Sequence, residues 1–214
     1  PPRSTPKPSS AASDVYKRQP YTDVDYEGPV YHEETRVWVT SETKIILKGY
    51  DKESGVNTTY YRVDNGPWFT YTEPFYIPWQ GEHMLSIYSV DHVGNTQTVV
   101  NKTIIVYNTP PKIKIDLPKK GWLHVFGKPL FPIILRKVFV VGKLVVVVSV
   151  QSNQSIMSNV SFLVDGKTMF VDNKPPYRWE YTERLLLNHE LQVVAFDKLG
   201  HVSKELLPVF FFSL

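Results

Sequence analysis

Short apolar runs separated by polar turn residues make up the chain from Pro29 onward. The runs are rich in β-branched and aromatic side chains, and Gly, Pro, Asn or Asp interrupts them about every eight to twelve residues, a spacing typical of β-sandwiches. No long helix is predicted, because no stretch keeps a helical apolar period. The pattern predicts strands at 36–40, 44–50, 58–64, 74–78, 83–91, 98–107, 112–116, 138–150, 159–165, 177–181, 189–197 and 203–212.

The two halves of this pattern resemble each other. YYRVDNG, which ends at Gly66, matches SFLVDG, which ends at Gly166, and HMLSIYSVDHVGN at 83–95 matches HELQVVAFDKLGH at 189–201. An aspartate follows the first histidine of the longer motif by eight residues in both copies. We therefore expect an all-β protein made of two tandem copies of one fold.

The repeated motifs also set the strand register. Side chains at every second position of a strand share one face, so the apolar alternate positions of 83–91 and 189–197 are expected to face a core. The predicted core positions are Leu85, Ile87, Leu191 and Val193, with Tyr61, Val63, Phe162 and Val164 facing them. The VDNG and VDG sequences predict hairpin turns with positive φ.

The sequence divides into three predicted segments. Residues 1–27 begin with a Pro-, Ser- and Lys-rich string without apolar periodicity, and we expect a disordered linker or a non-native N-terminal segment there. Residues 28–109 form the first predicted domain and residues 110–214 the second. The Pro110–Pro111 pair is expected to stiffen the joint, because proline fixes φ and favours extended backbone before it.

Charge and motifs exclude several function classes. The net charge of +3 comes from residues 1–19, and the rest of the chain holds 20 basic and 20 acidic residues, which argues against a nucleic-acid partner. The sequence contains no run of about 18 apolar residues, the length that a membrane-spanning helix needs. No cysteine and no hydrolase, metalloprotease or nucleotide-binding motif is present, so we predict that the chain is not an enzyme.

The motifs of the first copy, SGV, YRVDNG, GEH and YSVDHVGN, are similar to Ig-like repeats of the OmpL47 type. The second copy, with VSFLVDGK and HELQVVAFDKLGH, resembles an Ig-like domain of archaeal cell-surface and secreted proteins, although His201 stands where the family has Asn. The resemblance implies two tandem immunoglobulin-like β-sandwich domains that serve as structural, spacer or interaction modules. It implies no activity, because one sandwich fold hosts many functions.

Three acidic residues of the first copy are candidate calcium ligands. Asp51, Glu53 and Asp91 lie in two loops that can share one end of a sandwich, and Ca²⁺ prefers six to eight oxygen ligands. The favoured alternative is that Asp51 and Asp91 cap their own turns through hydrogen bonds to the backbone. In the second copy Gln151 and Asn153 replace the acids, so no calcium site is expected there. No cofactor other than calcium in the first copy is predicted.

Aromatic residues and glycosylation sequons supply the remaining candidate sites. Trp68, Tyr71 and Trp79 belong to an aromatic cluster that can stack on sugar rings or anchor a protein, although packing over the edge of the sandwich is the favoured alternative. Sequons of the form N-x-S/T begin at Asn57, Asn101, Asn153 and Asn159 and favour an extracellular or cell-surface location.

Together these features predict a non-catalytic spacer or display segment of an exported surface protein, with adhesion as a further role. The expected partners are other domains of the same longer chain and a cell-surface protein or glycan. The alternative is an accessory carbohydrate- or protein-binding module of a secreted hydrolase or protease, which exposure of Trp68 and Trp79 on one face would favour.

Overall fold

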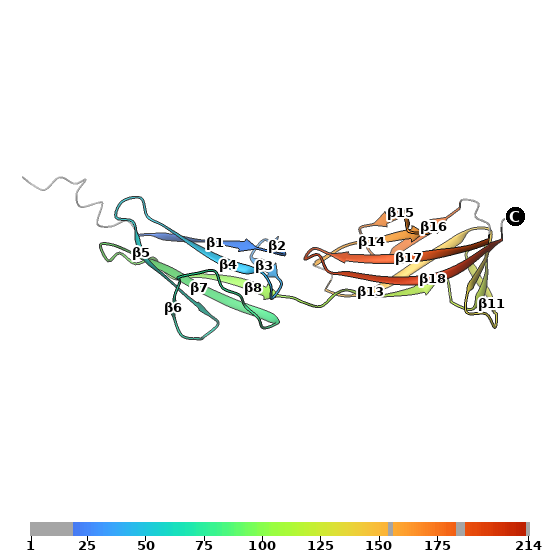
Figure 1. The fold of residues 1–214 in the computed structure, drawn as a ribbon, viewed down its shortest axis with the longest axis horizontal. Coiled ribbons are helices and arrows are strands. Elements are labelled where there is room, and N and C mark those ends of the chain that lie inside the picture. The colour runs from blue at the N-terminus through green and yellow to red at the C-terminus, as the bar shows by residue number, and fades with distance from the viewer. Residues whose placement is uncertain (1–18, 154–155, 183–186, 213–214) are drawn as a thin grey trace, which may run out of the picture. The chain divides into compact units, whose positions relative to one another are not determined.

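The computed structural model describes residues 19–153, 156–182 and 187–212 and divides the chain into two compact units, with the division between Asn108 and Thr109. Both units consist of strands (Figure 1), and the described residues include no helix long and apolar enough to cross a membrane. The first unit contains β1 (Tyr21–Glu27), β2 (Val30–Glu33), β3 (Arg36–Val39), β4 (Lys44–Tyr50), β5 (Val56–Val63), β6 (Phe69–Thr70), β7 (Gly81–Asp91) and β8 (Val100–Val106).

The described residues of the second unit form ten strands. They are β9 (Lys112–Leu117), β10 (Trp122–Val125), β11 (Lys128–Pro132), β12 (Val138–Val141), β13 (Leu144–Gln151), β14 (Met157–Val164), β15 (Lys167–Asp172), β16 (Tyr177–Tyr181), β17 (Leu187–Asp197) and β18 (Val202–Phe212). Each unit packs a small sheet against a large one, so the prediction of tandem β-sandwich domains is confirmed.

In the first domain β1 and β4 form the small sheet, and the large sheet has the order β2-β3-β8-β7-β5-β6. The core between them includes the predicted Leu85 and Ile87, both fully buried, with Tyr61 and Val63 packed against it. The predicted strand at 74–78 is not a strand. Phe75 instead exchanges two backbone hydrogen bonds with Ile45, which adds a single bridge to the small sheet.

Strand β1 corrects the prediction for residues 1–27. Residues 1–18 lie outside the described residues, but Tyr21–Glu27 pairs with β4 along its whole length and belongs to the first domain. The buried Thr22 hydroxyl is 2.7 Å from both the Ser89 hydroxyl and the Gln97 side-chain oxygen. These bonds connect β1 to the end of β7 and to the loop after it, so β1 is an integral part of this domain.

In the second domain β16, β13 and β9 form the small sheet, and the large sheet has the order β11-β10-β12-β18-β17-β14-β15. Residues 138–150, predicted as one strand, are two strands in different sheets, because Gly142 turns the backbone with a φ of +76°. Both strands supply core residues. The predicted core positions Leu191, Val193, Phe162 and Val164 are all buried, which confirms the register.

The VDG turn of the second domain has the predicted conformation. Asp165 and Gly166 both have positive φ and join β14 to β15 in a two-residue hairpin, as a type I′ turn requires. In the corresponding turn of the first domain only Asp64 has positive φ. Residues 64–68 form a longer connection between β5 and β6. This longer connection carries Trp68, which is described below.

Candidate functional site

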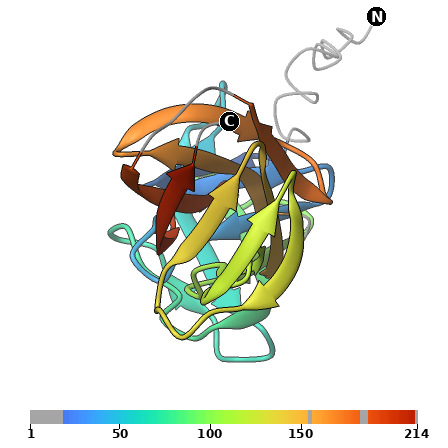
Figure 2. The ribbon, with the colours of Figure 1, turned by 90° about the vertical axis from the view of Figure 1, so that its right-hand side faces the viewer.

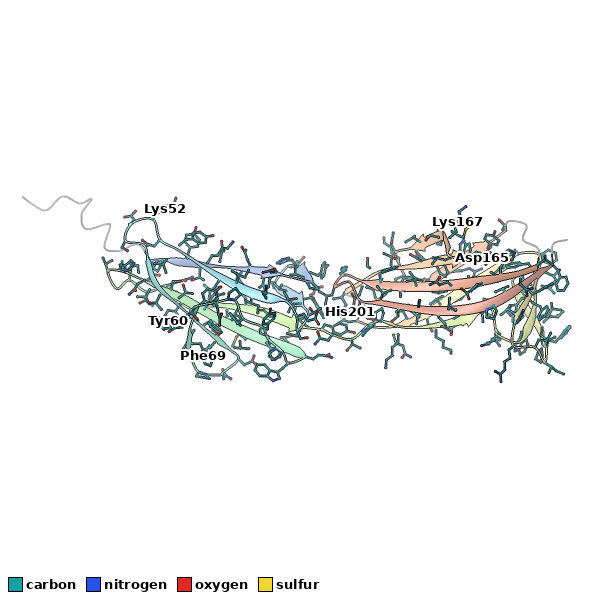
Figure 3. All side chains as sticks on the ribbon, in the orientation of Figure 1. Lys52, Tyr60, Phe69, Asp165, Lys167 and His201 are labelled. Atoms are coloured by element: carbon teal, nitrogen blue, oxygen red, sulfur yellow. The ribbon has the colours of Figure 1, made fainter. Side chains whose placement is uncertain are left out.

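The first domain has a surface groove of about 340 Å³ at the edge of its large sheet. Its lining is mostly aromatic, with one carboxylate, and consists of Tyr61, Val63, Asp64, Gly66, Pro67, Phe69, Phe75, Tyr76 and Trp79. We call it the aromatic groove. Trp79 is 65% exposed, and Phe69 (labelled in Figure 3) and Tyr76 are also exposed, so ring faces are open to solvent.

Two of the residues that line the aromatic groove, Tyr61 and Phe75, also pack against the core of the first domain. Tyr61 lies on the inward face of β5 and stacks on Phe75 with ring centroids 4.0 Å apart and planes 15° from parallel. Tyr71 contacts both rings edge-on, at 6.4 Å and 6.5 Å, and does not line the groove. Such stacked and edge-on pairs stabilise one arrangement of the rings.

Trp68 and Trp79 lie on opposite faces of the sheet, so they cannot contribute to one stacking surface. The Trp68 ring contacts Tyr88 edge-on at 4.8 Å, and the Arg62 guanidinium lies 4.7 Å from its centroid. Tyr88 points away from the core because its neighbour Ile87 points into it. Of the three predicted stacking residues, only Trp79 therefore lines the aromatic groove.

Asp64 lines the aromatic groove and bonds to the first residues of β7. Its carboxylate accepts a bond from the Met84 N–H and lies 2.9 Å from Nδ1 of His83, whose Nε2 is 2.9 Å from the Trp79 carbonyl. The hydrogen bonds from His83 and from Met84 hold the pKa of Asp64 below its usual value. His83 thus connects the hairpin turn to the backbone of Trp79.

The same contact recurs in the second domain between Asp165 and His189. Nδ1 of His189 is 2.6 Å from the Asp165 carboxylate, which also accepts a bond from the Glu190 N–H. The Glu190 bond and the His189 bond lower the pKa of Asp165. The sequence placed both histidines at equivalent strand starts but did not show this pairing, since the turn and the strand are about 20 residues apart.

The loops that carry Asp51 and Asp91 do meet, through a hydrogen bond of 3.1 Å from the His92 N–H to the Gly55 carbonyl. The Asp51 carboxylate, however, accepts bonds from the N–H groups of Glu53, Ser54 and Gly55 within its own loop. Desolvation alone would raise the pKa of Asp51. The hydrogen bonds favour the charged carboxylate more strongly, so the pKa of Asp51 is lowered.

Asp91 is used in the same way. Desolvation raises its pKa, but bonds from the Asn95 side chain and N–H, from the Ser54 hydroxyl of the neighbouring loop and from the Val93 N–H bring it below the usual value. Among residues 19–153, 156–182 and 187–212 no group of three His, Asp or Glu side chains is placed to hold a metal. The calcium site at Asp51, Glu53 and Asp91 stays a prediction, and the geometry favours the turn-capping alternative.

His201 takes the place of Asn95 in the second domain. Its Nδ1 is 2.7 Å from the Asp197 carboxylate, the same length as the Asn95–Asp91 side-chain bond, and its N–H also donates to Asp197. Asp197 accepts a further bond from the Leu199 N–H. His201 therefore makes the same turn contact as Asn95 does in the first domain, and its side chain is only 19% exposed.

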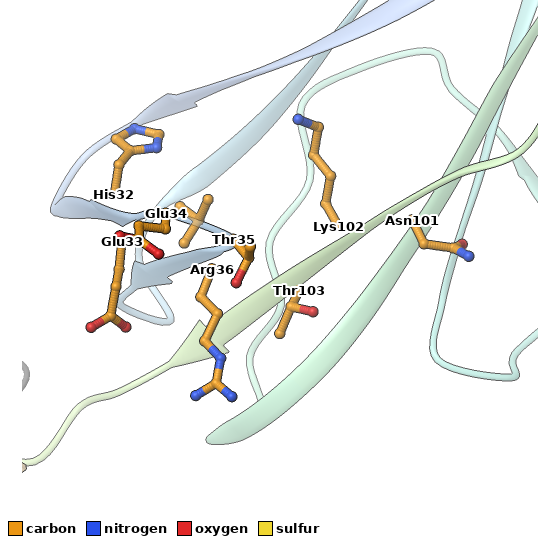
Figure 4. Close-up of a pocket in the computed structure, with 9 residues that line it drawn as sticks. His32, Glu33, Glu34, Thr35, Arg36, Asn101, Lys102 and Thr103 are labelled. Carbon is orange, nitrogen blue, oxygen red and sulfur yellow. The ribbon is translucent and has the colours of Figure 1, made fainter.

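A second pocket, of about 450 Å³, lies where the β2–β3 turn meets β8 (Figure 4). Sequence reasoning did not identify it, although His32, Glu33, Arg36 and Lys102 line it. Strand alternation and register place His32 and Lys102 on one face of the sheet and Glu33 and Arg36 on the other, as Figure 4 shows. These ionisable groups do not converge on one point, so the pocket offers no catalytic arrangement.

The four sequon asparagines differ in accessibility. Asn57, Asn101 and Asn153 are exposed, although residues 154–155 of the third sequon lie outside the described residues. Asn159 is half-buried in β14, and its Nδ2 donates to the Ser158 hydroxyl at 3.2 Å. An accessible side chain is the first requirement for glycan attachment, so the first three remain the better candidates.

No family model matches the sequence, and no curated protein matches it. Among solved structures the chain is similar to the fibronectin(III)-like modules of Clostridium thermocellum CbhA, with 18% identity and a TM-score of 0.51 over 89% of this chain and 95% of that one. A 1.5-MDa bacterial ice-binding adhesin gives 9% identity and a TM-score of 0.41, over 91% and 66%. The four N-terminal Ig domains of Dscam1 give 12% and 0.35, over 83% and 43%. At 18% identity the likeness to the CbhA modules concerns the fold alone.

Proposed function

We propose that the chain is a non-catalytic spacer and display segment of an exported cell-surface protein, of the kind that its resemblance to OmpL47-type and archaeal Ig-like domains implies. The observation that carries the proposal is that each unit has its own core. In addition, the loop carboxylates Asp51 and Asp197 accept hydrogen bonds from their own turns. Such a module supplies length and surface to its neighbours, and its partners are other domains of the same chain.

The spacer role is tested at the joint between the domains. Because the chain has no cysteine, spin labels can be placed at Glu42→Cys and Lys204→Cys, both exposed positions, and the distribution of distances between them measured. Replacing Pro110 and Pro111 by glycine is expected to widen that distribution about twofold, because glycine linkers behave as flexible coils.

Pro74→Gly is the matched control, since it removes an exposed proline within the first domain and should leave the width unchanged. Equal widths for the parent chain and the Pro110, Pro111 variant would contradict a stiff spacer. The result would then favour a flexible tether between two independent modules.

The aromatic groove favours a second function, carbohydrate binding by an accessory module. Exposed ring faces of Trp79, Tyr76 and Phe69 around a groove with one carboxylate are suited to stacking on sugar rings and bonding to a hydroxyl. Tryptophan fluorescence can be titrated with β-1,4-linked hexasaccharides of glucose, mannose and N-acetylglucosamine. Trp79→Ala is expected to weaken binding about tenfold, by loss of a central stacking ring.

Trp68→Ala is the matched control, because Trp68 is also exposed but lies on the opposite face of the same sheet. It should leave the affinity unchanged. If no hexasaccharide binds, or if both substitutions weaken binding equally, the groove is not a sugar site and the spacer function stands alone.

A further inference from the structure

Residues 119–137 of the second domain form a strongly basic segment. The sequence KKGWLHVFGKPLFPIILRK contains Lys119, Lys120, Lys128, Arg136 and Lys137 and no acidic residue, and all five basic side chains are exposed. Outside residues 1–19 the chain as a whole has as many acidic as basic residues, so this concentration of charge is local. We call the segment the basic hairpin.

Large apolar side chains are exposed on the same hairpin. Their exposure ranges from 48% at Phe131 to complete at Ile134, and the set is Phe126, Leu130, Phe131, Ile134 and Leu135. Single exposed apolar residues are common on protein surfaces, but five within ten residues are typical of an interaction site.

The fold holds these side chains in their exposed positions. β10 and β11 pair as an antiparallel hairpin, and its turn residues Phe126 and Gly127 both have positive φ. The Phe126 N–H donates to the Val141 carbonyl of β12, and the Gly121 N–H donates to the Lys137 carbonyl, which closes the base. The apolar residues are therefore fixed on a folded scaffold.

His124 anchors the basic end of the hairpin from inside. Its ring is buried, and its Nε2 accepts a hydrogen bond of 3.0 Å from the Lys119 N–H, which fixes the backbone before Lys120. The Lys119 ammonium lies 4.9 Å from the Trp122 ring centroid, so its charge stays beside apolar surface. Basic and apolar groups are thus presented together.

The apolar surface continues onto the neighbouring strand ends. Val141 pairs with Val125 on one side and with Phe212 on the other, so the three side chains share the outward face of the large sheet. Phe212 is 48% exposed and extends the apolar surface beyond the hairpin. Figure 2 shows the hairpin, in yellow-green, at the end of the second domain that faces the viewer.

We propose that the basic hairpin binds peripherally to the surface of an anionic lipid bilayer. Phe126, Leu130 and Phe131 would enter the boundary between headgroups and acyl chains, while the lysines and Arg136 contact lipid phosphates. Interfacial anchors combine these two features, because apolar burial and attraction to anionic headgroups add together. A nucleic-acid site would need the charges but not the exposed aliphatic groups, so the bilayer is the better fit.

The inference is tested by sedimentation of the full chain with vesicles. Phosphatidylcholine vesicles with about one-third phosphatidylglycerol are expected to bind the chain, and pure phosphatidylcholine vesicles to bind it at least about tenfold more weakly. Lys120→Glu with Lys128→Glu should lower the partition coefficient at least about tenfold by reversing two charges. Phe126→Ser with Leu130→Ser should lower it by a similar factor through lost apolar burial.

Matched pairs elsewhere in the same domain control for general charge and hydrophobicity. Lys167→Glu with Lys204→Glu, and Val171→Ser with Leu206→Ser, change exposed residues outside the hairpin and should leave the partition coefficient unchanged. Circular dichroism of every variant checks that the fold persists.

Four outcomes would overturn the inference. The first is equal binding to neutral and anionic vesicles, and the second is equal loss in hairpin and control variants. The third is absence of vesicle binding; a dimer that the hairpin variants dissociate would then identify a second copy as the occupant. The fourth is binding to duplex DNA that the charge reversals abolish and the serine substitutions leave intact, which would identify nucleic acid.

Discussion

Phe162→Ala is expected to lower the free energy of unfolding of the second domain by about 3–5 kcal/mol, the usual cost of truncating a buried aromatic residue. Phe162 is fully buried in β14, and its ring centroid lies 5.7 Å from that of Trp179, which belongs to the opposite sheet. The substitution removes the contact between the two layers and leaves a cavity that the sheets cannot close. Hydrogen exchange of the Val193 and Ile87 amides in guanidinium chloride reports the two domains separately.

Phe170→Ala provides the matched control. Phe170 pairs with Phe162 across β14 and β15 and stacks on its ring, with centroids 6.1 Å apart, but is 41% exposed. Its truncation is expected to cost less than half as much, because part of the ring is already in water. An equal cost for both substitutions would contradict the difference in burial between Phe162 and Phe170. A loss of protection at Ile87 in the first domain would contradict two independent cores.

Asp197→Ala is expected to destabilise the second domain by about 2–3 kcal/mol, because it leaves several buried donors without an acceptor. The Asp197 side chain is completely buried and accepts bonds from the Leu199 N–H, the His201 N–H and the His201 ring. The 197–201 turn depends on this carboxylate. Equilibrium unfolding in guanidinium chloride, followed at Val193, measures the loss.

Asp197→Asn keeps the size of the side chain and changes only its hydrogen-bonding groups. Asparagine keeps one oxygen for the Leu199 and His201 N–H groups but presents an amide donor to the His201 ring, so an intermediate loss is expected. Asp91→Ala should destabilise the first domain in the same sense, since Asp91 holds the equivalent turn. If Asp197→Ala and Asp197→Asn leave the stability unchanged, the turn is held by its backbone alone.

Local patterns accounted for most strands and for the core. The alternation in 83–91 and 189–197 placed Leu85, Ile87, Leu191 and Val193 on the buried face, as the structure confirms. This success has a simple cause: strand side chains alternate with a period of two, so one apolar face is visible in a few consecutive residues. The tandem organisation was equally readable, because both copies keep the same turn and strand motifs.

The candidate site depended on contacts that local patterns do not contain. The sequence favoured packing of the aromatic cluster and left the exposure of Trp79 open, and only the structure shows its ring in solvent. Its separation from Trp68 follows from the register of β5 and β7, which places the Tyr88 side of the sheet away from the core. The Asp64–His83 and Asp165–His189 bonds likewise join a turn to a distant strand start. Spacing alone does not show which loop meets which strand.

The sequence by itself determined the strand-rich fold, the two copies and the buried face of each repeated strand. The tertiary structure alone decided that Tyr21–Glu27 completes the first domain, that Gly142 divides 138–150 between two sheets, and which aromatic residues share a groove. The physical reason is that strand formation depends on neighbours along the chain. Sheet membership and the grouping of side chains depend instead on hydrogen bonds and packing between segments far apart in the sequence.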